Sequence, residues 1–366
     1  MTASKNRIGI FRPGTAVPDN GASSAEAVSL VESLYAHEPR AARTAGRLYA
    51  RSGIKRRHSV VLQRDARGRL QQTLIDRNNG TLQMPGTGQR MRFFQAHASS
   101  LAAQACRSAL KNAGCSTAQI THLITVSCTG FYAPGVDVEL IDTLGLPATT
   151  RRIQVGFMGC HGMLNALRAA RAIAGAQPEA RVLVCAVELC SLHFSGKSDP
   201  MCMVADSLFA DGAAAVVVAA TDAAPYVLAS EGSYLFPDSR GMMSWTIGDE
   251  GFVMSLSPQL PGMLQKNLAP VIDSWLAESG VQRSQVAHWL VHPGGPRILR
   301  AAAGALELPE SALQLSRQIL SDYGNMSSPT LLFILHALGE VEAGSLLALV
   351  GFGPGITCEM LLLKAV

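Results

Sequence analysis

Residues 159–189, GCHGMLNALRAARAIAGAQPEARVLVCAVEL, decide the fold that we predict for this chain. A glycine and a cysteine precede a helix of small apolar residues, and that helix leads to a strand that is apolar along nearly its whole length. The same order returns at residues 324–355, GNMSSPTLLFILHALGEVEAGSLLALVGFGPG, where Asn325 takes the place of the cysteine. This repeat predicts an internal duplication with two similar halves that meet at a shared centre. We assign 1–221 to the first half and 222–366 to the second.

Further segments continue the pattern on both sides of this repeat. Buried strands that alternate with helices predict a layered α/β fold whose sheet is covered on both faces. The segment 237–262, rich in Gly, Pro and Met, interrupts the pattern and is predicted to form a wall of a ligand cavity. The predicted helices include 98–114, 269–280 and 327–340, and the predicted strands include 120–130, 212–220, 286–295 and 345–355.

Composition limits the class of protein. The 366 residues are 48% hydrophobic and 16% charged, with a formal net charge of +4, which suits a compact enzyme rather than a disordered chain. No block of Lys and Arg is interleaved with aromatic residues, so we expect no nucleic-acid partner. No run of about 18 apolar residues and no signal-peptide core are present, so we expect no membrane span and a cytoplasmic location.

The eight cysteines contain no Cys-x-x-Cys pair and lie mostly in apolar segments. This pattern argues against a disulfide framework and against structural zinc, and it predicts that most of the thiols are buried core residues. Cys160 differs, because a helix start presents free N–H groups and a positive dipole end that favour a thiolate. On this feature alone, Cys160 is either a packed thiol at a tight turn or a nucleophile that needs a base.

Two residues of the second half are candidate partners for Cys160. His292 ends the apolar strand HWLV, and α/β folds gather ligands at the carboxyl ends of strands. Asn325 can donate an amide hydrogen to a carbonyl oxygen, so that His292 and Asn325 together would form an oxyanion hole. A turn histidine and a helix-capping asparagine are the alternatives for each residue taken singly. His161 points about 100° away from Cys160 on the helix and is predicted to pack or cap.

The segments HFSGKSD, LFADGAAAVVV, VHPGGPRIL, YGNMSSPTLLFIL and GFGPGITCEM follow the GC of Cys160 in one order. In this order they resemble the type III polyketide synthases, the chalcone synthase family of the thiolase fold, over nearly the whole chain. The resemblance implies a duplicated, thiolase-like αβαβα fold and a homodimer, in which the apolar segment 133–140 would reach across the interface.

The resemblance also implies roles for the three candidate residues. Cys160 would accept a starter acyl group from acyl-CoA and hold the growing chain as a thioester. His292 would keep Cys160 as a thiolate and, with Asn325, bind the thioester carbonyl of malonyl-CoA. Decarboxylation would give the enolate that attacks the Cys160 thioester. The departing CO2 drives the reaction, so the resemblance implies no metal and no redox cofactor.

The resemblance also implies which residues of this chain contact the substrate. Phe209 matches a gatekeeper phenylalanine between the CoA tunnel and the cavity, and the second gatekeeper position falls on Met254, which lacks the flat ring. Arg47 and Arg51 match basic positions for CoA, while the third such position falls on Thr44, beside Arg43.

The cavity positions point to a substrate. His193 and Trp245 are larger than the plant residues at their positions and would narrow a plant-type pocket. Ala133 and Cys190 replace larger side chains, as in bacterial members that bind long fatty acyl chains, and each buried methylene contributes about 0.8 kcal/mol. This pattern favours a fatty acyl-CoA starter and an alkylpyrone or alkylresorcinol product. Ser327, in the YGNMSS segment, completes the predicted substrate-binding set.

Cys128 supports an alternative substrate and product. Some bacterial synthases that build tetrahydroxynaphthalene from malonyl units alone have a cysteine at this position, although a plain cavity-lining role is the simpler interpretation. Two other hypotheses are a ketoacyl synthase of fatty-acid initiation, which typically has an HQAN-like segment in place of HPGG, and a thiolase-fold scaffold without catalysis. The starter, the number of extensions and the mode of cyclisation are left open by the sequence.

Overall fold

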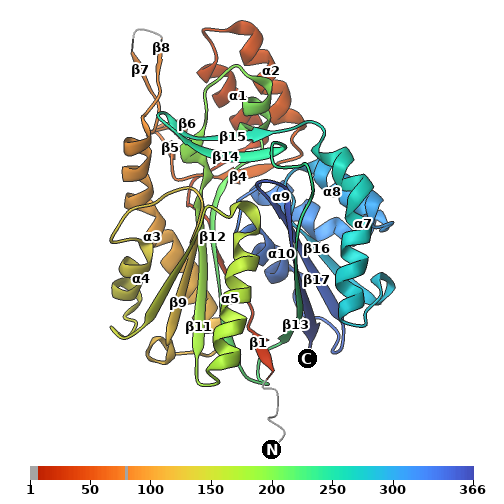
Figure 1. The fold of residues 1–366 in the computed structure, drawn as a ribbon. Helices are drawn as coiled ribbons and strands as arrows, with labels where there is room; N and C mark the ends of the chain where they lie inside the picture. The colour runs from red at the N-terminus through yellow and green to blue at the C-terminus, as the bar shows by residue number, and fades with distance from the viewer. Residues whose placement is uncertain (1–6, 79–80) are drawn as a thin grey trace, which may run out of the picture.

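The computed structural model describes residues 7–78 and 81–366. Ten strands of the described residues form one mixed sheet in the order β10-β9-β11-β12-β1-β13-β18-β17-β16, with β2 paired to β12 (Figure 1). These strands are β1 (Ile8–Ile10), β2 (Gly14–Ala16), β9 (His122–Ser127), β10 (Arg151–Gly156), β11 (Arg181–Leu189), β12 (Asp211–Ala220), β13 (Tyr226–Leu235), β16 (Val286–Val291), β17 (Leu346–Gly353) and β18 (Thr357–Ala365).

Counted from the centre outward, the first four strands follow the same order in both parts of the sheet, and the first part has one further strand at its edge, β10, which pairs with β9. The central pair is β1 and β13, which are antiparallel, and each is followed by an antiparallel strand, β12 or β18. The next strand outward is β11 in the first part and β17 in the second. Beyond these lie β9, which runs parallel to β11, and β16, which runs parallel to β17. The repeat predicted from residues 159–189 and 324–355 is therefore an actual repeat of strand order; the boundary at 221/222 stays a prediction.

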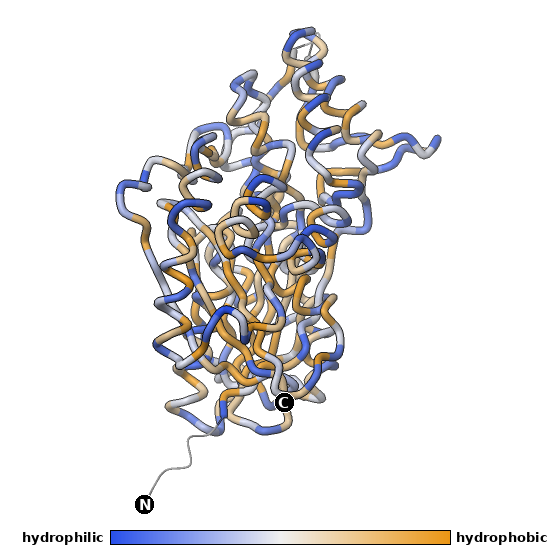
Figure 2. Tube along the Cα trace, turned by 90° about the vertical axis from the view of Figure 1, so that its right-hand side faces the viewer, coloured by the Kyte–Doolittle hydropathy of each residue, from blue (hydrophilic) through white to orange (hydrophobic). Residues whose placement is uncertain are grey.

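Alternating burial divides the structure into five layers. Along β11, Val182, Val184 and Ala186 face one core, while Leu183 and Cys185 face another. The first core lies between the two parts of the sheet and contains the inner helices α5 and α10, and two outer cores lie under α3 and under α7 with α8. The order helix, sheet, helix, sheet, helix follows, and Figure 2 shows hydrophobic residues gathered along the central strands. The helices are α1 (Ser24–Leu34), α2 (Pro39–Arg51), α3 (Thr87–Asn112), α4 (Val136–Leu144), α5 (Gly162–Ala176), α6 (Pro200–Asp206), α7 (Leu260–Glu278), α8 (Pro296–Ala305), α9 (Gln314–Tyr323) and α10 (Thr330–Leu338).

The sequence-predicted elements are present with shifted ends. The helix predicted at 98–114 is the second part of the longer α3, and the helix predicted at 269–280 begins earlier, as α7. The strand predicted at 286–295 ends at Val291, because the Pro-Gly-Gly turn follows directly. The segment 237–262 contains the hairpin of β14 (Met243–Gly248) and β15 (Gly251–Leu256), which covers the top of the first part of the sheet (Figure 1).

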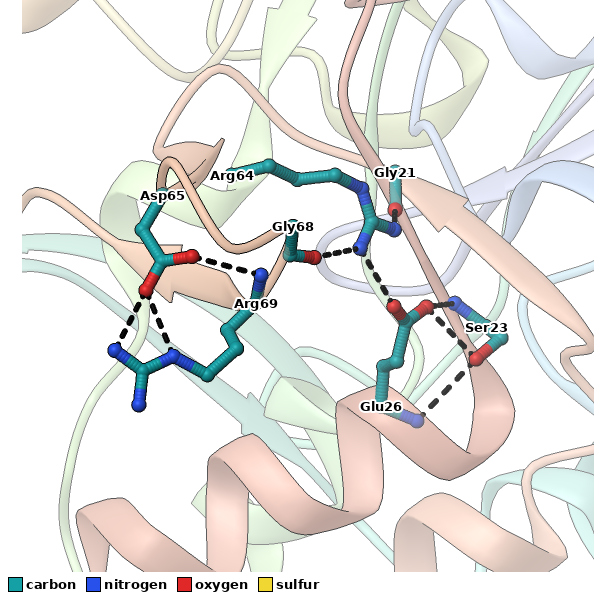
Figure 3. A network of polar contacts seen from close by, with 7 residues as sticks. All are labelled: Gly21, Ser23, Glu26, Arg64, Asp65, Gly68 and Arg69. Carbon is teal, nitrogen blue, oxygen red and sulfur yellow. Dashed lines mark hydrogen bonds and ion pairs between the residues drawn. The ribbon is translucent and has the colours of Figure 1, made fainter.

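A cap of short elements lies above the sheet and contains α1, α2 and small hairpins (Figure 1). The start of α1 is fixed by a capping box, in which Glu26 N–H donates to Ser23 Oγ at 3.3 Å and Ser23 N–H donates to Glu26 Oε2 at 2.8 Å (Figure 3). Arg64 donates to the other Glu26 oxygen, and these bonds lower the pKa of Glu26 to about 2. The strands of the cap pair as β3 (Gly21–Ser23) with β4 (Arg56–His58), on either side of α1 and α2 in the chain, and as the hairpins of β5 (Leu62–Arg64) with β6 (Leu70–Gln72) and of β7 (Asp76–Asn78) with β8 (Thr81–Gln83).

Among the helices of residues 7–78 and 81–366, none combines the length and the apolar character needed to cross a membrane.

Candidate active site

Cys160 lies in a single 3-10 turn, Gly159–His161, between β10 and the start of α5. Gly159 has a φ of 71°, which glycine adopts without strain, and a β-carbon there would lie 2.4 Å from Cδ of Pro354. Pro354 follows the last residue of β17, within the GFGPG segment. The glycine of the first motif is therefore required because the second motif packs directly against it.

The Cys160 thiol is buried, and burial raises its pKa to about 11, although the side chains of Ser327 and Asn325 act in the opposite direction. Burial therefore acts against the thiolate that the helix start predicted. The physical reason is that loss of hydration in the protein interior outweighs the dipole of one helix end.

His292 follows β16 directly, and its backbone N–H donates to Val350 O of β17 at 2.8 Å. The side chain is almost completely buried, and neither ring nitrogen has a hydrogen-bond partner among the described residues. Burial, with a smaller contribution from His161, lowers the pKa of His292 to about 3. The ring is therefore neutral near pH 7, with one N–H available to donate and one nitrogen available to accept.

Asn325 is held by its backbone and oriented by its neighbour. It forms a parallel bridge with Phe209, in which Asn325 N–H donates to Leu208 O and Ala210 N–H donates to Asn325 O, each at 2.9 Å. Asn325 Oδ1 accepts the backbone N–H of Ser327 at 2.8 Å. Because the amide oxygen is used in this way, the amide nitrogen is the end left to donate to a ligand.

His161 packs, as predicted. It is buried, its Nδ1 lies 2.7 Å from Asn165 Oδ1, and a β-carbon at Gly353 would lie 2.3 Å from its ring.

A cavity opens beside Cys160, which is one of its lining residues. It collects residues from the segments that follow β9, β10 and β11, from α6 and the residues after it, from the β14–β15 hairpin and from the segment that follows Asn325. The predicted positions that line it are Cys128, Cys160, Cys190, His193, Phe209, Trp245, Met254 and Ser327.

The narrowing predicted at His193 and Trp245 has a defined geometry. The His193 ring stacks on Phe252 at 4.2 Å with an angle of 13° between the planes, and Trp245 Nε1 donates to Cys128 O at 2.7 Å. His193 Nδ1 accepts the Phe252 N–H at 2.9 Å, and Nε2 lies 2.7 Å from Thr129 O. Burial lowers the pKa of His193 to about 4, so the ring is a neutral, fixed part of the wall.

Three predicted substrate contacts lie elsewhere. Ala133 is exposed on the loop between β9 and α4 and is not among the residues that line the cavity of its own chain, so its predicted substrate contact stays a prediction. The loop runs over the surface, so removal of side-chain volume there opens no space inside this chain. Arg47 and Arg51 are exposed on α2 and have no ion pair within the part of the chain that the structure describes.

Sequence reasoning missed Glu188, a fully buried carboxylate on β11. It accepts hydrogen bonds from Cys128 N–H at 3.0 Å and from the hydroxyls of Thr129 and Ser328 at 2.6 Å each. The Cys128 sulfur lies 3.3 Å from one Glu188 oxygen and 3.5 Å from Ser327 Oγ. The available signal was an acidic residue inside the apolar run RVLVCAVEL. Burial raises the pKa of Glu188, and the surrounding donors oppose that rise.

Within the described residues, no group of three or more His, Cys, Asp or Glu side chains is arranged to hold a metal ion.

The fold defines a class, and comparison with known proteins identifies the family within it. The sheet and layers are those of a thiolase-like enzyme. Models of the chalcone and stilbene synthases match residues 2–222, as the N-terminal domain, and 228–366, as the C-terminal domain. The chain belongs to the chalcone and stilbene synthase family, as a type III polyketide synthase. It is an acyltransferase that catalyses decarboxylative Claisen condensation. The ketoacyl synthase and scaffold hypotheses are therefore set aside.

Relatives with two different products are similar to this chain. It is 33% identical to 1,3,6,8-tetrahydroxynaphthalene synthase of Streptomyces coelicolor, over 96% of this chain and 90% of that protein. It is 31% identical to the alpha-pyrone synthesis polyketide synthase-like Pks18 of Mycobacterium tuberculosis, over 95% and 88%. PKS-I from the brown alga Ectocarpus siliculosus superposes with a TM-score of 0.91, at 28% identity and full coverage of both chains. The Streptomyces coelicolor synthase gives a TM-score of 0.86, at 31% identity over 98% and 99% of the chains.

Proposed function

We propose that this type III polyketide synthase loads a long-chain fatty acyl group from acyl-CoA onto Cys160. It then extends that group with malonyl-CoA and closes the product to an alkylpyrone or an alkylresorcinol. The observation that carries this proposal is a second cavity, largely apolar, beside the catalytic cavity. Both cavities are lined by Ser191, Phe194 and Phe209, so one layer of side chains forms their common wall.

The second cavity suits an alkyl chain because its wall is largely apolar. It lies under α1 and is bounded by the side chains of Ala27, Leu30, Val31 and Leu34, with further apolar residues from β5 and from the segment that ends at Ile75. Polar groups in the wall are already bonded within the protein. Tyr49 Oη, for example, donates to Asp206 O at 2.8 Å. An apolar tail therefore fits this space better than a polar ligand does.

The opposite route, past Cys128, offers little room. The ring of Phe94 packs against Gly130 so closely that a β-carbon at Gly130 would lie 2.0 Å from Phe94 Cγ. An acyl tail on Cys160 therefore has more space on the α1 side.

The proposed chemistry uses the geometry of three residues. Cys160 attacks the acyl-CoA carbonyl, its thiol proton passes through the ring of His292 to the departing CoA sulfur, and CoA leaves as the free thiol. The N–H of His292 and the amide of Asn325 then donate to the malonyl thioester oxygen, which becomes an enolate as CO2 leaves. The enolate carbon attacks the Cys160 thioester, and a carbon–carbon bond forms while the carbon–sulfur bond breaks. Among the described residues, neither ring nitrogen of His292 has a partner at hydrogen-bond geometry, although the Asn325 side chain lies close enough to raise its pKa, and a substrate carbonyl would satisfy the donor.

A malonyl-CoA-only synthase, with tetrahydroxynaphthalene or a phloroglucinol-type product, is the second candidate. Its support is the contact of Cys128 with Glu188 and Ser327 at the cavity wall, together with the similarity to the Streptomyces coelicolor synthase.

The remaining proposals concern partners and location. Arg47 and Arg51, with Arg43 nearby, would meet the phosphates of CoA, and no metal or redox cofactor takes part. The protein would act as a cytoplasmic homodimer, and the exposed Ala133 and the residues up to 140 would meet the partner subunit.

The test is a product analysis by mass spectrometry with malonyl-CoA alone and with acyl-CoA starters from two to sixteen carbons. Long starters should give alkylated products. An aromatic product from malonyl-CoA alone, with no product from long starters, would overturn the fatty-acyl proposal.

A substitution that fills the second cavity tests whether the alkyl tail of the starter lies there. Ala27→Phe places a ring in the second cavity, and Ala25→Phe, on the exposed side of the same helix, is the matched control. Ala27→Phe should lower kcat/KM for long starters about tenfold for every two methylenes that can no longer be buried, and leave acetyl-CoA unaffected. An equal loss with short and long starters would assign this cavity to the CoA arm instead.

A further inference from the structure

Asp206 is a carboxylate in the wall of the catalytic cavity that the condensation chemistry does not use. It is the last residue of α6, three positions before Phe209, and it lines the same cavity as Cys160. Its carboxylate accepts Ser195 Oγ–H at 2.7 Å and Ser195 N–H at 3.2 Å. An ionised carboxylate offers about four acceptor positions, so these bonds fix the group and still leave acceptor capacity toward the cavity.

The surroundings of Asp206 place it near its point of titration. Burial raises the pKa of Asp206 to about 7, while Ser195 and the Arg90 guanidinium act in the opposite direction. Arg90 on α3 is completely buried, and its Nη2 has no hydrogen-bond partner among the described residues. Tyr35, Tyr49 and Cys202 also face Asp206, and its charge contributes to the raised pKa of each. These three groups are therefore neutral at pH 7, and Asp206 is the one that titrates.

The other ionisable groups in the cavity wall are less suited to proton transfer. Both ring nitrogens of His193 are engaged with backbone groups, and its pKa is lowered to about 4. The thiols of Cys128, Cys190 and Cys202 have a raised pKa, chiefly through burial. Cys160 carries the chain. Among the described residues that line the cavity, Asp206 is the one carboxyl group.

We propose that Asp206 is the catalytic base of product release, which removes the proton from the enol hydroxyl of the polyketide chain as that oxygen attacks the thioester carbonyl on Cys160. This inference rests on the lactone-forming function proposed above. The new bond joins the enol oxygen to the acyl carbon, and the carbon–sulfur bond breaks. The proton passes to Asp206 and then, directly or through water, to the departing Cys160 sulfur, so that the lactone and the free thiol are the products.

The transfer of a proton explains why lactone release needs a base other than the residues of the condensation. The departing sulfur requires a proton, because burial raises the pKa of the Cys160 thiol to about 11. A carboxylate that accepts the enol proton can return it to the sulfur within one cavity. A base is most effective when its pKa lies near the working pH, a condition that His292, with a pKa of about 3, does not meet.

Asp206→Asn tests the proposal, because asparagine keeps the shape and the acceptor oxygen for Ser195. Asp199→Asn is the matched control, since Asp199 caps the same helix through Met201 N–H and Cys202 N–H, and asparagine caps equally well. Three quantities are measured: CO2 release in the first condensation, lactone by mass spectrometry, and the chain held on Cys160 by intact mass. In Asp206→Asn we expect an unchanged first condensation, lactone release slower by about 100-fold or more, and polyketide accumulated on Cys160.

The pH profile separates proton transfer from a structural role. Lactone release by the wild type should rise with pH through about 7, as Asp206 ionises. Ser195→Ala removes a group that lowers this pKa, so the rise should move to higher pH, and in Asp206→Asn it should disappear.

Several outcomes would overturn the inference. The first is that Asp206→Asn releases lactone at the wild-type rate. The second is that Asp206→Asn loses the first condensation and lactone release to the same extent. The third is that Ser195→Ala leaves the pH dependence of lactone release unchanged. If the wild type forms an alkylresorcinol and no lactone, this inference fails while the proposed function stands, and if it forms neither product from long starters, both fail. If Asp206→Asn still releases lactone at full rate, this inference alone fails.

Discussion

Phe209 and Asn325 pair through their backbones as an isolated parallel bridge. The bridge joins the segment after α6 to the segment before α10, two parts of the chain that are more than 100 residues apart. The predicted gatekeeper ring and the predicted oxyanion amide are therefore held at a fixed separation. A change at the bridge should alter catalysis even though it touches neither side chain.

Gly324→Ala should displace Asn325. Gly324 has a φ of 80°, and a β-carbon there would lie 2.9 Å from Ala210 Cβ. We expect a loss of about 1–3 kcal/mol in the free energy of unfolding and at least a tenfold loss of malonyl-CoA decarboxylation. Gly339→Ala is the control, because Gly339 has a similar φ of 73° but open space around it. If both variants lose decarboxylation equally, the bridge does not position Asn325.

Cys160 should be a slow nucleophile in the free enzyme. With a pKa of about 11, its alkylation by iodoacetamide at pH 8 should be about 100-fold slower than that of free cysteine and should rise with pH up to about 11. Ser327→Ala should slow the reaction further, because the Ser327 side chain lowers this pKa. Peptide mapping separates Cys160 from the partly exposed Cys202. Rapid, pH-independent alkylation of Cys160 above pH 7 would show that a thiolate is present at rest.

Glu188→Ala should destabilise the first part of the sheet. It would leave Cys128 N–H and the hydroxyls of Thr129 and Ser328 without their buried acceptor. We expect a loss of about 2–4 kcal/mol in urea unfolding, because each buried unsatisfied donor costs about 1–3 kcal/mol and the removed charge was itself costly to bury. The exposed Glu179→Ala should change the value by less than about 0.5 kcal/mol. Equal effects of the two variants would contradict the network.

The free energy of unfolding should fall as pH rises from about 4 to 7. The folded state raises the pKa of Asp206 from 3.8 to about 7, so it binds a proton that the unfolded chain has already released in that window. The contribution is present below pH 3.8 and lost by about pH 7, and it amounts to at most about 4 kcal/mol. Asp206→Asn should flatten this slope in urea titrations, and an unchanged slope would refute the raised pKa.

Local patterns were enough to predict the repeated αβ units and the three candidate catalytic residues. Apolar periodicity sets strands such as Arg181–Leu189 directly, and the glycines at the two motif turns are visible as residue types. The spacing of Cys160, His292 and Asn325 at equivalent ends of two repeats then indicates a common centre.

Only the tertiary structure decided how these residues behave there. Burial depends on the packing of all five layers, and it raises the pKa of both Cys160 and Asp206. The exposure of Ala133, the network around Glu188 and the second cavity under α1 likewise arise from contacts between segments far apart in the chain. The sequence by itself determined which groups are present and on which elements they lie, because those depend on local periodicity. Their charge state and the space beside them depend on long-range packing, which only the folded chain defines.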